Sequence, residues 1–327
     1  MDLKIDHWIR GQDENGAVSL ARTLCMAERG RLGLPLDTVA ISGRVKTADE
    51  GIDGRTKFPE TADTHFPRGH YVWQIKSGKT APSVSKEIDP KKHAALIEAI
   101  KNGADYVLFW TNDPTDKQRT AVTTAFTNSV KKIRADANVV PIFADEIEQL
   151  CYQHVAVLAQ HGPMPITGLV GLEVWARGFS PIEFEPDAPR LAAIGAIRQH
   201  VAVRDEPNAI LVYGDTGVGK SRLVYEALSQ DGVRERVLVA PDPIGWHQGL
   251  LSDIANTPGS SLILVVDDCD ADERRRLNNL VGLCQGRIRL ITTGPRATRE
   301  RAVEDRRRLE LPPLEAQASK NLSLIHI

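Results

Sequence analysis

The sequence is poor in cysteine and carries almost no net charge. Its 41 Lys and Arg nearly balance 43 Asp and Glu, so the formal net charge of −2 gives no overall signal for a nucleic-acid partner. The 4 cysteines, Cys25, Cys151, Cys269 and Cys284, have no C-x-x-C spacing, which disfavours a zinc site or a disulfide framework. We therefore expect unpaired thiols in a reducing cytoplasm.

Long hydrophobic runs and a secretion signal are also missing. No stretch approaches about 18 consecutive apolar residues, the length that a membrane-spanning helix needs. Residues 1–6 lack the apolar core of a secretion signal. These features predict a cytoplasmic protein without a membrane span.

The composition that remains is typical of a globular protein, and the length suits two domains. Hydrophobic residues make up 42% of the 327 residues and charged residues 26%. Prolines gather between two patterned stretches. The predicted organisation is a first domain at residues 1–162, a Pro-rich linker at 163–188 and a second domain at 189–327 that opens with an amphipathic helix at 191–203.

The first stretch alternates between helical and strand-like patterns. Residues 50–69 are rich in Gly, Pro and charge, which indicates turns or a loose hairpin. Helices are expected at residues 17–28, ended by Gly30, at 90–103, capped by Asp89, at 117–134 and at 145–160. Strands are expected at 38–45, 70–75, 106–110 and 139–143. This order predicts a small mixed sheet with helices on its faces.

The clearest motif lies at residues 214–221, after an apolar run at 210–213 and before a helical stretch at 222–228. Its spacing, G-x-x-x-x-G-K-S in a strand–loop–helix setting, is that of a phosphate-binding loop. Lys220 is expected to reach the β- and γ-phosphates of a nucleotide, and Ser221 to bind Mg²⁺. The alternative is a Gly-rich turn before an ordinary helix. The full set expected around the phosphates is Gly214, Asp215, Thr216, Gly217, Val218, Gly219, Lys220 and Ser221.

Two later strands are expected to complete this site. The apolar run 262–266 ends in Asp267, expected to hold Mg²⁺, and Asp268, expected to orient or deprotonate the attacking water. The alternative is a strand that ends in acidic turn residues. A third strand at 288–292 leads to Thr293 and Arg296, which are expected near the γ-phosphate. For Arg296 a solvated position in a turn is equally open.

The first domain has a smaller polar constellation. Asp53 lies between Gly51 and Gly54, while Gln74 and Lys76 share one face of the strand at 70–75 because side chains alternate along a strand. A carboxylate and an amide oxygen can bind a hard cation, which makes Asp53 and Gln74 candidate ligands. Lys76 would orient water or stabilise developing negative charge. The alternative is a surface strand with solvated polar residues.

Because Gln74 is neutral, a further acid is expected at this metal site. Glu50 from the same turn and Glu28 from the first helix are the candidates, and each is also readable as an ordinary surface acid. Phosphodiester cleavage needs about 15–20 kcal/mol of transition-state stabilisation, which one acid and one lysine do not supply in water. A divalent cation, Mg²⁺ or Mn²⁺, is therefore part of the prediction.

Asp53 with Gln74 and Lys76 resembles the PD-(D/E)xK restriction-endonuclease-like superfamily. The resemblance is to the Mrr-like branch, in which Gln replaces the second acid, and it covers roughly residues 10–160. It implies a restriction-endonuclease-like mixed-sheet domain in which Asp53 and Gln74 bind metal and Lys76 assists hydrolysis. The strand at 106–110 is similar to the next core strand of that family.

The second domain resembles the P-loop NTPase module of STAND proteins. The resemblance lies in residues 214–221, in Asp267 with Asp268, and in the strand that leads to Thr293 and Arg296; the pair 294–295 departs from the pattern of many relatives. It implies an α/β parallel-sheet domain that binds ATP and Mg²⁺. Only twelve residues follow position 315, so this domain is expected to be incomplete and the chain to be a fragment.

The pairing of these domains is similar to that of bacterial anti-phage STAND proteins. It implies an ATP-regulated, metal-dependent DNA endonuclease in antiviral defence, with the NTPase as an oligomerisation switch. The implied partners are DNA, ATP, further copies of the chain and a phage-derived protein recognised by a missing C-terminal sensor. Two alternatives stay open: a regulatory NTP-binding protein whose first domain binds nucleic acid or a partner without cleaving it, and a motor-type ATPase in DNA processing.

Overall fold

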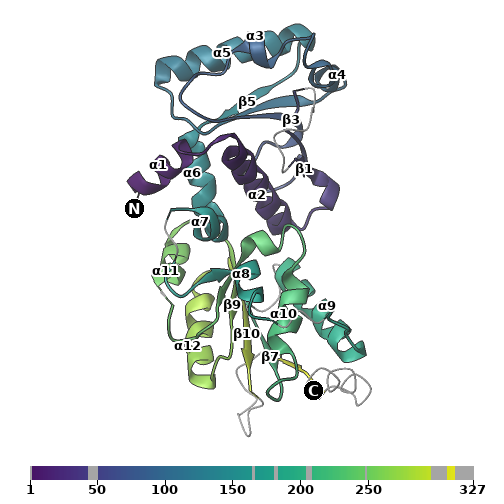
Figure 1. Ribbon diagram of the computed structural model, residues 1–327, viewed down its shortest axis with the longest axis vertical. Helices are drawn as coiled ribbons and strands as arrows, with labels where there is room; N and C mark the ends of the chain where they lie inside the picture. Colours follow the sequence, from purple (N-terminus) through teal and green to yellow (C-terminus); the bar gives the residue numbers. More distant parts are fainter. Residues whose placement is uncertain are drawn as a thin grey trace. The chain divides into compact units, whose positions relative to one another are not determined.

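The structure, a computed structural model, describes residues 2–42, 51–163, 166–179, 183–203, 208–246, 249–295 and 308–313. The chain divides into two compact units, Met1–Pro163 and Met164–Ile327. Each unit has its own sheet with helices packed against it (Figure 1). The fold is therefore mixed α/β, as the sequence predicted.

The sheet of the first unit has the order β1 (Val39–Ile41), β2 (Gly54–Phe58), β3 (Gly69–Lys76), β4 (Asp105–Trp110) and β5 (Val139–Ile142). The first two junctions are antiparallel and the last two are parallel. This is the mixed sheet that the sequence predicted. Residues 50–69 were predicted as turns or a loose hairpin, and β2 pairs antiparallel with β3 in that region. The strand itself was not assigned, because Gly and Lys are depleted in strands.

Helices cover both faces of this sheet. Trp73 and Ile75 of β3 face a core with α1 (Asp2–Arg10), α2 (Glu14–Leu32), α6 (Ala144–Gln153) and α7 (Val155–His161). Val72, one position away, faces the opposite core with α4 (Ala94–Lys101) and α5 (Asp116–Ile133). A short helix, α3 (Val84–Glu87), precedes α4. The site residues of β3 are thus held between two packed layers.

Several predicted boundaries in this unit were wrong. The helix expected to stop at Gly30 runs on to Leu32, where Gly33 in the left-handed region (φ +65°) closes it. The helix expected from Pro90 begins at Ala94, because residues 89–93 form a turn instead. The helix expected at 145–160 breaks at His154 into α6 and α7.

The second unit has a nearly parallel sheet. Its order is β11 (Arg308–Glu310), β7 (Ala209–Tyr213), β10 (Ile288–Gly294), β9 (Leu262–Val266), β8 (Val237–Ala240) and β6 (Val170–Gly171), and β6 is its antiparallel edge. The five residues of β9 are all buried, as expected for a strand with packing on both faces. Its longer helices are α9 (Ala188–Ala202), α10 (Lys220–Leu228), α11 (Gly249–Asn256) and α12 (Ala271–Gly282).

The stretch predicted as a linker contributes structure to the second unit. Between its prolines lie β6, which pairs with β8, and α8 (Leu172–Ala176), whose Leu172 and Trp175 are buried. Trp175 also packs edge-on against Phe179, with ring centroids 4.9 Å apart. The high proline content suggested a linker, but the buried Leu172 and Trp175 pack this part of the stretch into the core of the second unit.

The 4 cysteines lie buried and unpaired, as expected. Among the described residues, none of the helices combines the length and the hydropathy that crossing a bilayer requires.

Candidate functional site

The loop at residues 214–221 joins the end of β7 to the start of α10. Gly217 and Gly219 have φ angles of +82° and +87°, in the left-handed region that favours glycine. A Cβ on either would meet no heavy atom of the described residues within 4 Å, so space is open there. Gly214 serves a different purpose, since a Cβ there would lie 2.7 Å from the carbonyl oxygen of Leu311. The loop is therefore open at Gly217 and Gly219 and tightly packed at Gly214.

Lys220 and Ser221 lie in the first turn of α10. The Lys220 amine folds back over the loop and donates to the carbonyl oxygens of Gly214 (3.1 Å) and Asp215 (3.0 Å). The Ser221 hydroxyl donates to Oδ1 of Asp267 at 2.8 Å. The start of α10 thus carries an amine, a hydroxyl and the positive end of a helix dipole.

Asp267 lies directly after β9, and Thr293 lies near the end of the adjacent parallel strand β10. The Thr293 hydroxyl donates to Oδ1 of Asp267 at 2.5 Å and accepts from the backbone N–H of Asp268 at 2.9 Å. Parallel strands bring these groups together, because their carboxyl ends meet at one edge of the sheet. Ser221 and Thr293 therefore both donate to the same carboxylate oxygen of Asp267.

Asp268 and Thr293 differ in their surroundings. Asp268 is exposed and has a φ of +51°, uncommon for a residue other than glycine. Thr293 is 1% exposed, and its hydroxyl is occupied by the two aspartates. The side chain expected near the γ-phosphate thus contacts the acidic pair directly. Arg296, expected beside it, lies outside the described residues.

These residues fit a nucleotide with Mg²⁺. Open space at Gly217 and Gly219, the helix start at Lys220, and the Ser221 hydroxyl beside Asp267 are all at one edge of the sheet. Backbone N–H groups and a lysine suit phosphate oxygens, and a hydroxyl with a carboxylate suits Mg²⁺. Lys220, Ser221 and Asp267 would hold these groups.

The second constellation is in the first unit, at the junction of β2 and β3. Asp53 directly precedes β2, and its Oδ2 accepts from the backbone N–H of Ile75 at 2.7 Å. Its carboxylate therefore reaches the strand between Gln74 and Lys76. Burial raises the pKa of Asp53, while the Ile75 N–H and the Lys76 charge oppose that rise. Asp53 and Lys76 are consequently close enough to interact electrostatically.

Gln74 is more enclosed than the sequence indicated. It is 2% exposed, its Nε2 donates to the carbonyl oxygen of Glu87 at 2.9 Å, and its Oε1 accepts from the Tyr106 hydroxyl. The amide oxygen expected to bind a metal already has a partner. Gln74 acts here as a link between β3, β4 and α3.

Glu87, at the end of α3, belongs to this polar cluster, and the sequence did not single it out. Its Oε2 lies 2.8 Å from the Lys76 amine, and its own carbonyl is 2.8 Å from His93 Nδ1. Burial and then the charges of Glu87 and Asp53 raise the pKa of Tyr106 well above its usual range. Glu87 therefore shares one electrostatic environment with Asp53 and Tyr106. Its position 11 residues past Lys76 gives no sequence signal, since only the fold of α3 against β3 brings it there.

The structure describes one of the two further acids predicted for this site, Glu28 and Glu50. The Glu28 carboxylate accepts from Arg31 Nε at 2.6 Å and from the backbone N–H of His65 at 2.7 Å, and it lies 3.3 Å from His154 Nε2. Burial alone would raise its pKa, but hydrogen bonds from Arg31 and His154 lower it far below its usual range. Glu28 is a buried structural acid here. Glu50 lies outside the described residues.

A metal would have to be held by a small ligand set. In the described part of the chain, no three His, Cys, Asp or Glu side chains are arranged to hold a metal ion. The fitting donors are the Asp53 carboxylate, which keeps one oxygen beyond the Ile75 bond, and the Glu87 carboxylate beside Lys76. Water or substrate oxygens would supply the remaining positions.

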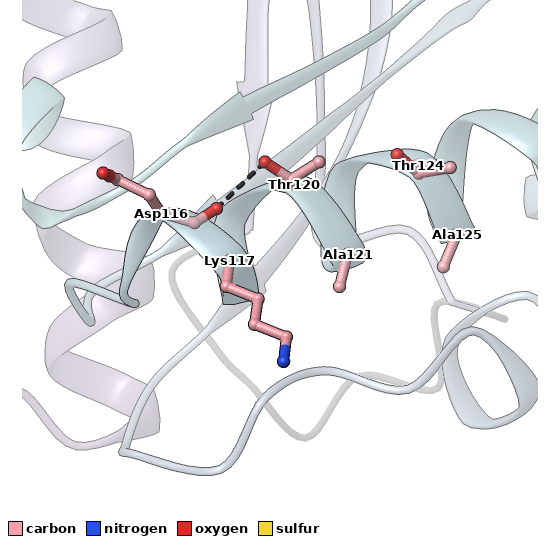
Figure 2. A pocket seen from close by; sticks show the side chains of 6 residues that line it. All are labelled: Asp116, Lys117, Thr120, Ala121, Thr124 and Ala125. Carbon is pink, nitrogen blue, oxygen red and sulfur yellow. Dashed lines mark hydrogen bonds between the residues drawn. The ribbon is translucent and has the colours of Figure 1, made fainter.

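Two surface depressions lie among the described residues of the first unit. Figure 2 shows one along α5, lined by Asp116, Lys117, Thr120, Ala121, Thr124 and Ala125. Its drawn hydrogen bond, from the Thr120 hydroxyl to the Asp116 carbonyl (2.9 Å), belongs to the helix itself. Another depression is lined by residues of α1, the following turn and Pro163. Neither brings a reactive pair together.

Comparisons with known proteins add little to this description. No protein-family model matches the sequence, and no curated protein matches it. One solved structure with a partial likeness is that of C. elegans PCH-2, with 11% identity over 38% of this chain and 42% of that chain, and a TM-score of 0.31. Another is Rhizobiales Trip13, with 18% identity over 52% of this chain and 60% of that chain, and a TM-score of 0.22. The chain thus spans less than two thirds of the length of either structure.

Proposed function

We propose that the second unit binds and hydrolyses ATP with Mg²⁺. The observation that carries this proposal is the contact between the Ser221 hydroxyl and Asp267 at the open start of α10. Backbone N–H groups of the 214–221 loop and the Lys220 amine bind the phosphates, and Ser221 and Asp267 hold Mg²⁺. Asp268, exposed beside them, orients the attacking water. Mg²⁺ neutralises phosphate charge when bound.

Binding of a fluorescent ATP analogue tests this proposal. Lys220→Ala should weaken Mg²⁺-dependent binding about 10- to 150-fold, since losing a charged hydrogen bond costs roughly 1.5–3 kcal/mol. Lys117→Ala, a lysine on α5 of the first unit, is the matched control and should bind as the native protein does. Equal binding by the Lys220 variant would contradict the proposal.

We also propose that the first unit is a metal-dependent DNA endonuclease under the control of this nucleotide site. Support comes from Asp53 anchored on β3 and from Glu87 beside Lys76. The two carboxylates hold a divalent cation, which would supply charge stabilisation and an activated water. Lys76 orients that water or stabilises the charge on the phosphate. Gln74 keeps Glu87 in place through the carbonyl of that residue.

Plasmid cleavage in Mg²⁺ or Mn²⁺ tests the nuclease proposal. Lys76→Ala should abolish cleavage while ATP binding persists, because the two sites use separate residues. Lys79→Ala is the control, since that lysine is exposed three positions later and outside β3. Cleavage retained in the Lys76 variant would remove the nuclease assignment and leave the ATP-binding proposal standing.

A second candidate function is a first unit that binds nucleic acid or a partner without cutting it. Two contacts favour it: the Gln74 amide oxygen is taken by Tyr106, and Lys76 is paired with Glu87. In that case DNA should bind in a gel-shift assay without cleavage in either metal, whether or not ATP is present. Steady ATP turnover stimulated by DNA alone would instead favour a motor-type ATPase.

The biological setting that we propose is bacterial antiviral defence. The resemblance of residues 214–221 to STAND modules, beside a nuclease-like unit, supports an ATP-driven assembly of several copies triggered by a phage protein. Cells that express the gene should form fewer phage plaques than cells that carry Lys220→Ala or Lys76→Ala. Equal plaque counts in all three, across a panel of phages, would contradict this setting.

A further inference from the structure

Arg190 is a buried cation that the proposed nucleotide chemistry does not use. It lies in the first turn of α9 and is 2% exposed. Its Nη1 contacts Oδ2 of Asp187 at 2.5 Å. Its Nη2 donates to the carbonyl oxygens of Val218 (3.0 Å) and Pro312 (3.3 Å). One guanidinium therefore joins the start of α9, the 214–221 loop and the residues that follow β11.

The contact with Val218 affects the part of the loop that faces open space. A peptide bond is planar and trans, so its carbonyl and the next N–H point in opposite directions. With the Val218 carbonyl directed toward Arg190, the N–H of Gly219 is directed away from it. Gly219 is the left-handed residue that precedes α10, where a Cβ would meet open space. Arg190 thus fixes the orientation of one N–H that a phosphate would meet.

The contact with Pro312 is on the other side of the same guanidinium. The preceding residue, Leu311, is 1% exposed and donates its N–H to the carbonyl of Tyr213 at 2.8 Å. Its own carbonyl packs against Gly214, the first residue of the loop. Residues 311–312 therefore contact both the beginning of the loop and, through Arg190, its end. A movement of the loop would therefore change both the Gly214–Leu311 contact and the contacts of Arg190.

We propose that Arg190 is a positioning residue that couples nucleotide binding to residues 311–312 of the chain. The inference rests on the proposed binding of a nucleotide at the 214–221 loop. Arg190 orders the Val218 peptide for phosphate binding and holds Pro312 with the same group. Coupling between two sites is reciprocal, so a nucleotide that orders the loop also stabilises residues 311–312, and their displacement weakens the nucleotide.

A planar guanidinium is suited to this task because it can donate to several acceptors at once. A lysine at this position would keep the charge beside Asp187 but would not reach Asp187 and both carbonyls in the same geometry. Arg190→Lys therefore keeps the positive charge beside Asp187 and loses the simultaneous contacts with the two carbonyl oxygens. Asp187→Asn does the reverse, since it removes the ion pair and leaves the two carbonyl contacts of Arg190 available.

The test combines amide hydrogen exchange at Leu311 with binding of ATPγS and Mg²⁺. In the native chain, the nucleotide should slow exchange of the Leu311 amide by at least about fivefold, the lower end of typical coupling. Arg190→Lys should lose that protection and bind ATPγS at least about fivefold more weakly. Asp187→Asn should keep both protection and affinity while its melting temperature falls. A purely structural Arg190 would lower the melting temperature and leave affinity and protection unchanged.

The outcomes separate this inference from the proposed function. Native protein that binds ATPγS without protecting Leu311 would overturn the coupling, and no variant is needed for that result. Native affinity in Arg190→Lys would also overturn it. Native protein that binds no nucleotide at all would remove both the proposed function and the coupling.

Discussion

The hydroxyl of Ser221 donates to Oδ1 of Asp267 at 2.8 Å, although the two residues are 46 positions apart in the sequence. The same carboxylate oxygen accepts from Thr293 at the end of the neighbouring strand. The start of α10 and the carboxyl ends of β9 and β10 therefore meet at one carboxylate oxygen of Asp267. A hydroxyl and a carboxylate held this way form a partial coordination shell for a hard cation.

The two adjacent aspartates are expected to have separable roles. Asp267→Asn should remove most of the Mg²⁺ dependence of ATP binding, because it replaces the anion that Ser221 and Thr293 surround. Asp268→Asn should leave binding intact and reduce ATP turnover. Titrations with and without Mg²⁺, together with phosphate-release rates, distinguish the two. Unchanged Mg²⁺ dependence in the Asp267 variant would count against the assignment.

Thr293 is expected to orient the acidic pair through its hydroxyl. Thr293→Val keeps the shape but leaves the partly buried N–H of Asp268 without its side-chain acceptor, at a cost of about 1 kcal/mol. ATP turnover should fall, and Thr293→Ser should restore it because the hydroxyl returns. Turnover and melting temperature are measured on all three proteins. If the valine variant turns over ATP normally, Asp267 and Asp268 do not need this contact.

Glu87 is expected to matter for metal binding in the first unit. Glu87→Gln keeps the shape but removes the charge that faces Lys76 and, in the proposed site, the cation. Binding of Mn²⁺, followed by paramagnetic resonance, should weaken at least about tenfold, near 1.4 kcal/mol. Glu98→Gln, an exposed acid on α4, is the control. Equal Mn²⁺ binding in both variants would remove Glu87 from the ligand set.

Glu28 is expected to make the stability of the first unit depend on pH. Its folded-state pKa is lowered below the unfolded value by Arg31 and His154 despite burial. A lowered pKa stabilises the fold above the unfolded pKa of about 4.3, and the contribution is lost as pH falls below that value. Glu28→Gln should destabilise the fold by about 3–5 kcal/mol at neutral pH, because Arg31 and His154 lose their buried partner.

Hydrogen exchange of α2 and β3 between pH 3 and pH 7 measures this effect in the full chain. The difference between native protein and Glu28→Gln should shrink toward pH 3, where protonation begins to remove the native advantage. Glu60→Gln, which changes an exposed acid in the same unit, is the control. A difference that stays constant with pH would show that Glu28 contributes through packing alone.

In the first unit, local sequence patterns predicted the buried strands more accurately than the helix ends. Apolar runs placed β3, β4 and β5 within a residue or two, because buried strands leave a strong local signal. The strand β2 left a weaker one, since its burial alternates over only five residues and its Arg55 and Lys57 occupy the less buried positions. Helix ends were misplaced where a cap depended on backbone conformation, as at Gly33.

The candidate site residues of the first unit show the same contrast between local patterns and long-range packing. Spacing singled out Asp53, Gln74 and Lys76 as candidates, and the fold brings the Asp53 carboxylate to the strand between the other two. The partners of Gln74 could not be found in this way. Tyr106 and Glu87 come from separate elements, 32 and 13 positions away, and reach Gln74 only through strand pairing and the packing of α3.

Local sequence patterns were enough to specify the glycine spacing of the 214–221 loop, the acidic end of β9 and the alternation of elements that forms the mixed sheet. These are short-range features, and backbone sterics and side-chain periodicity specify them locally. Three contacts depend instead on long-range packing: Thr293 with Asp267, Glu87 with Lys76, and Arg190 with both Val218 and Pro312. Those contacts depend on which strands are neighbours and which side chains are buried together, and that is settled only when the whole core is packed.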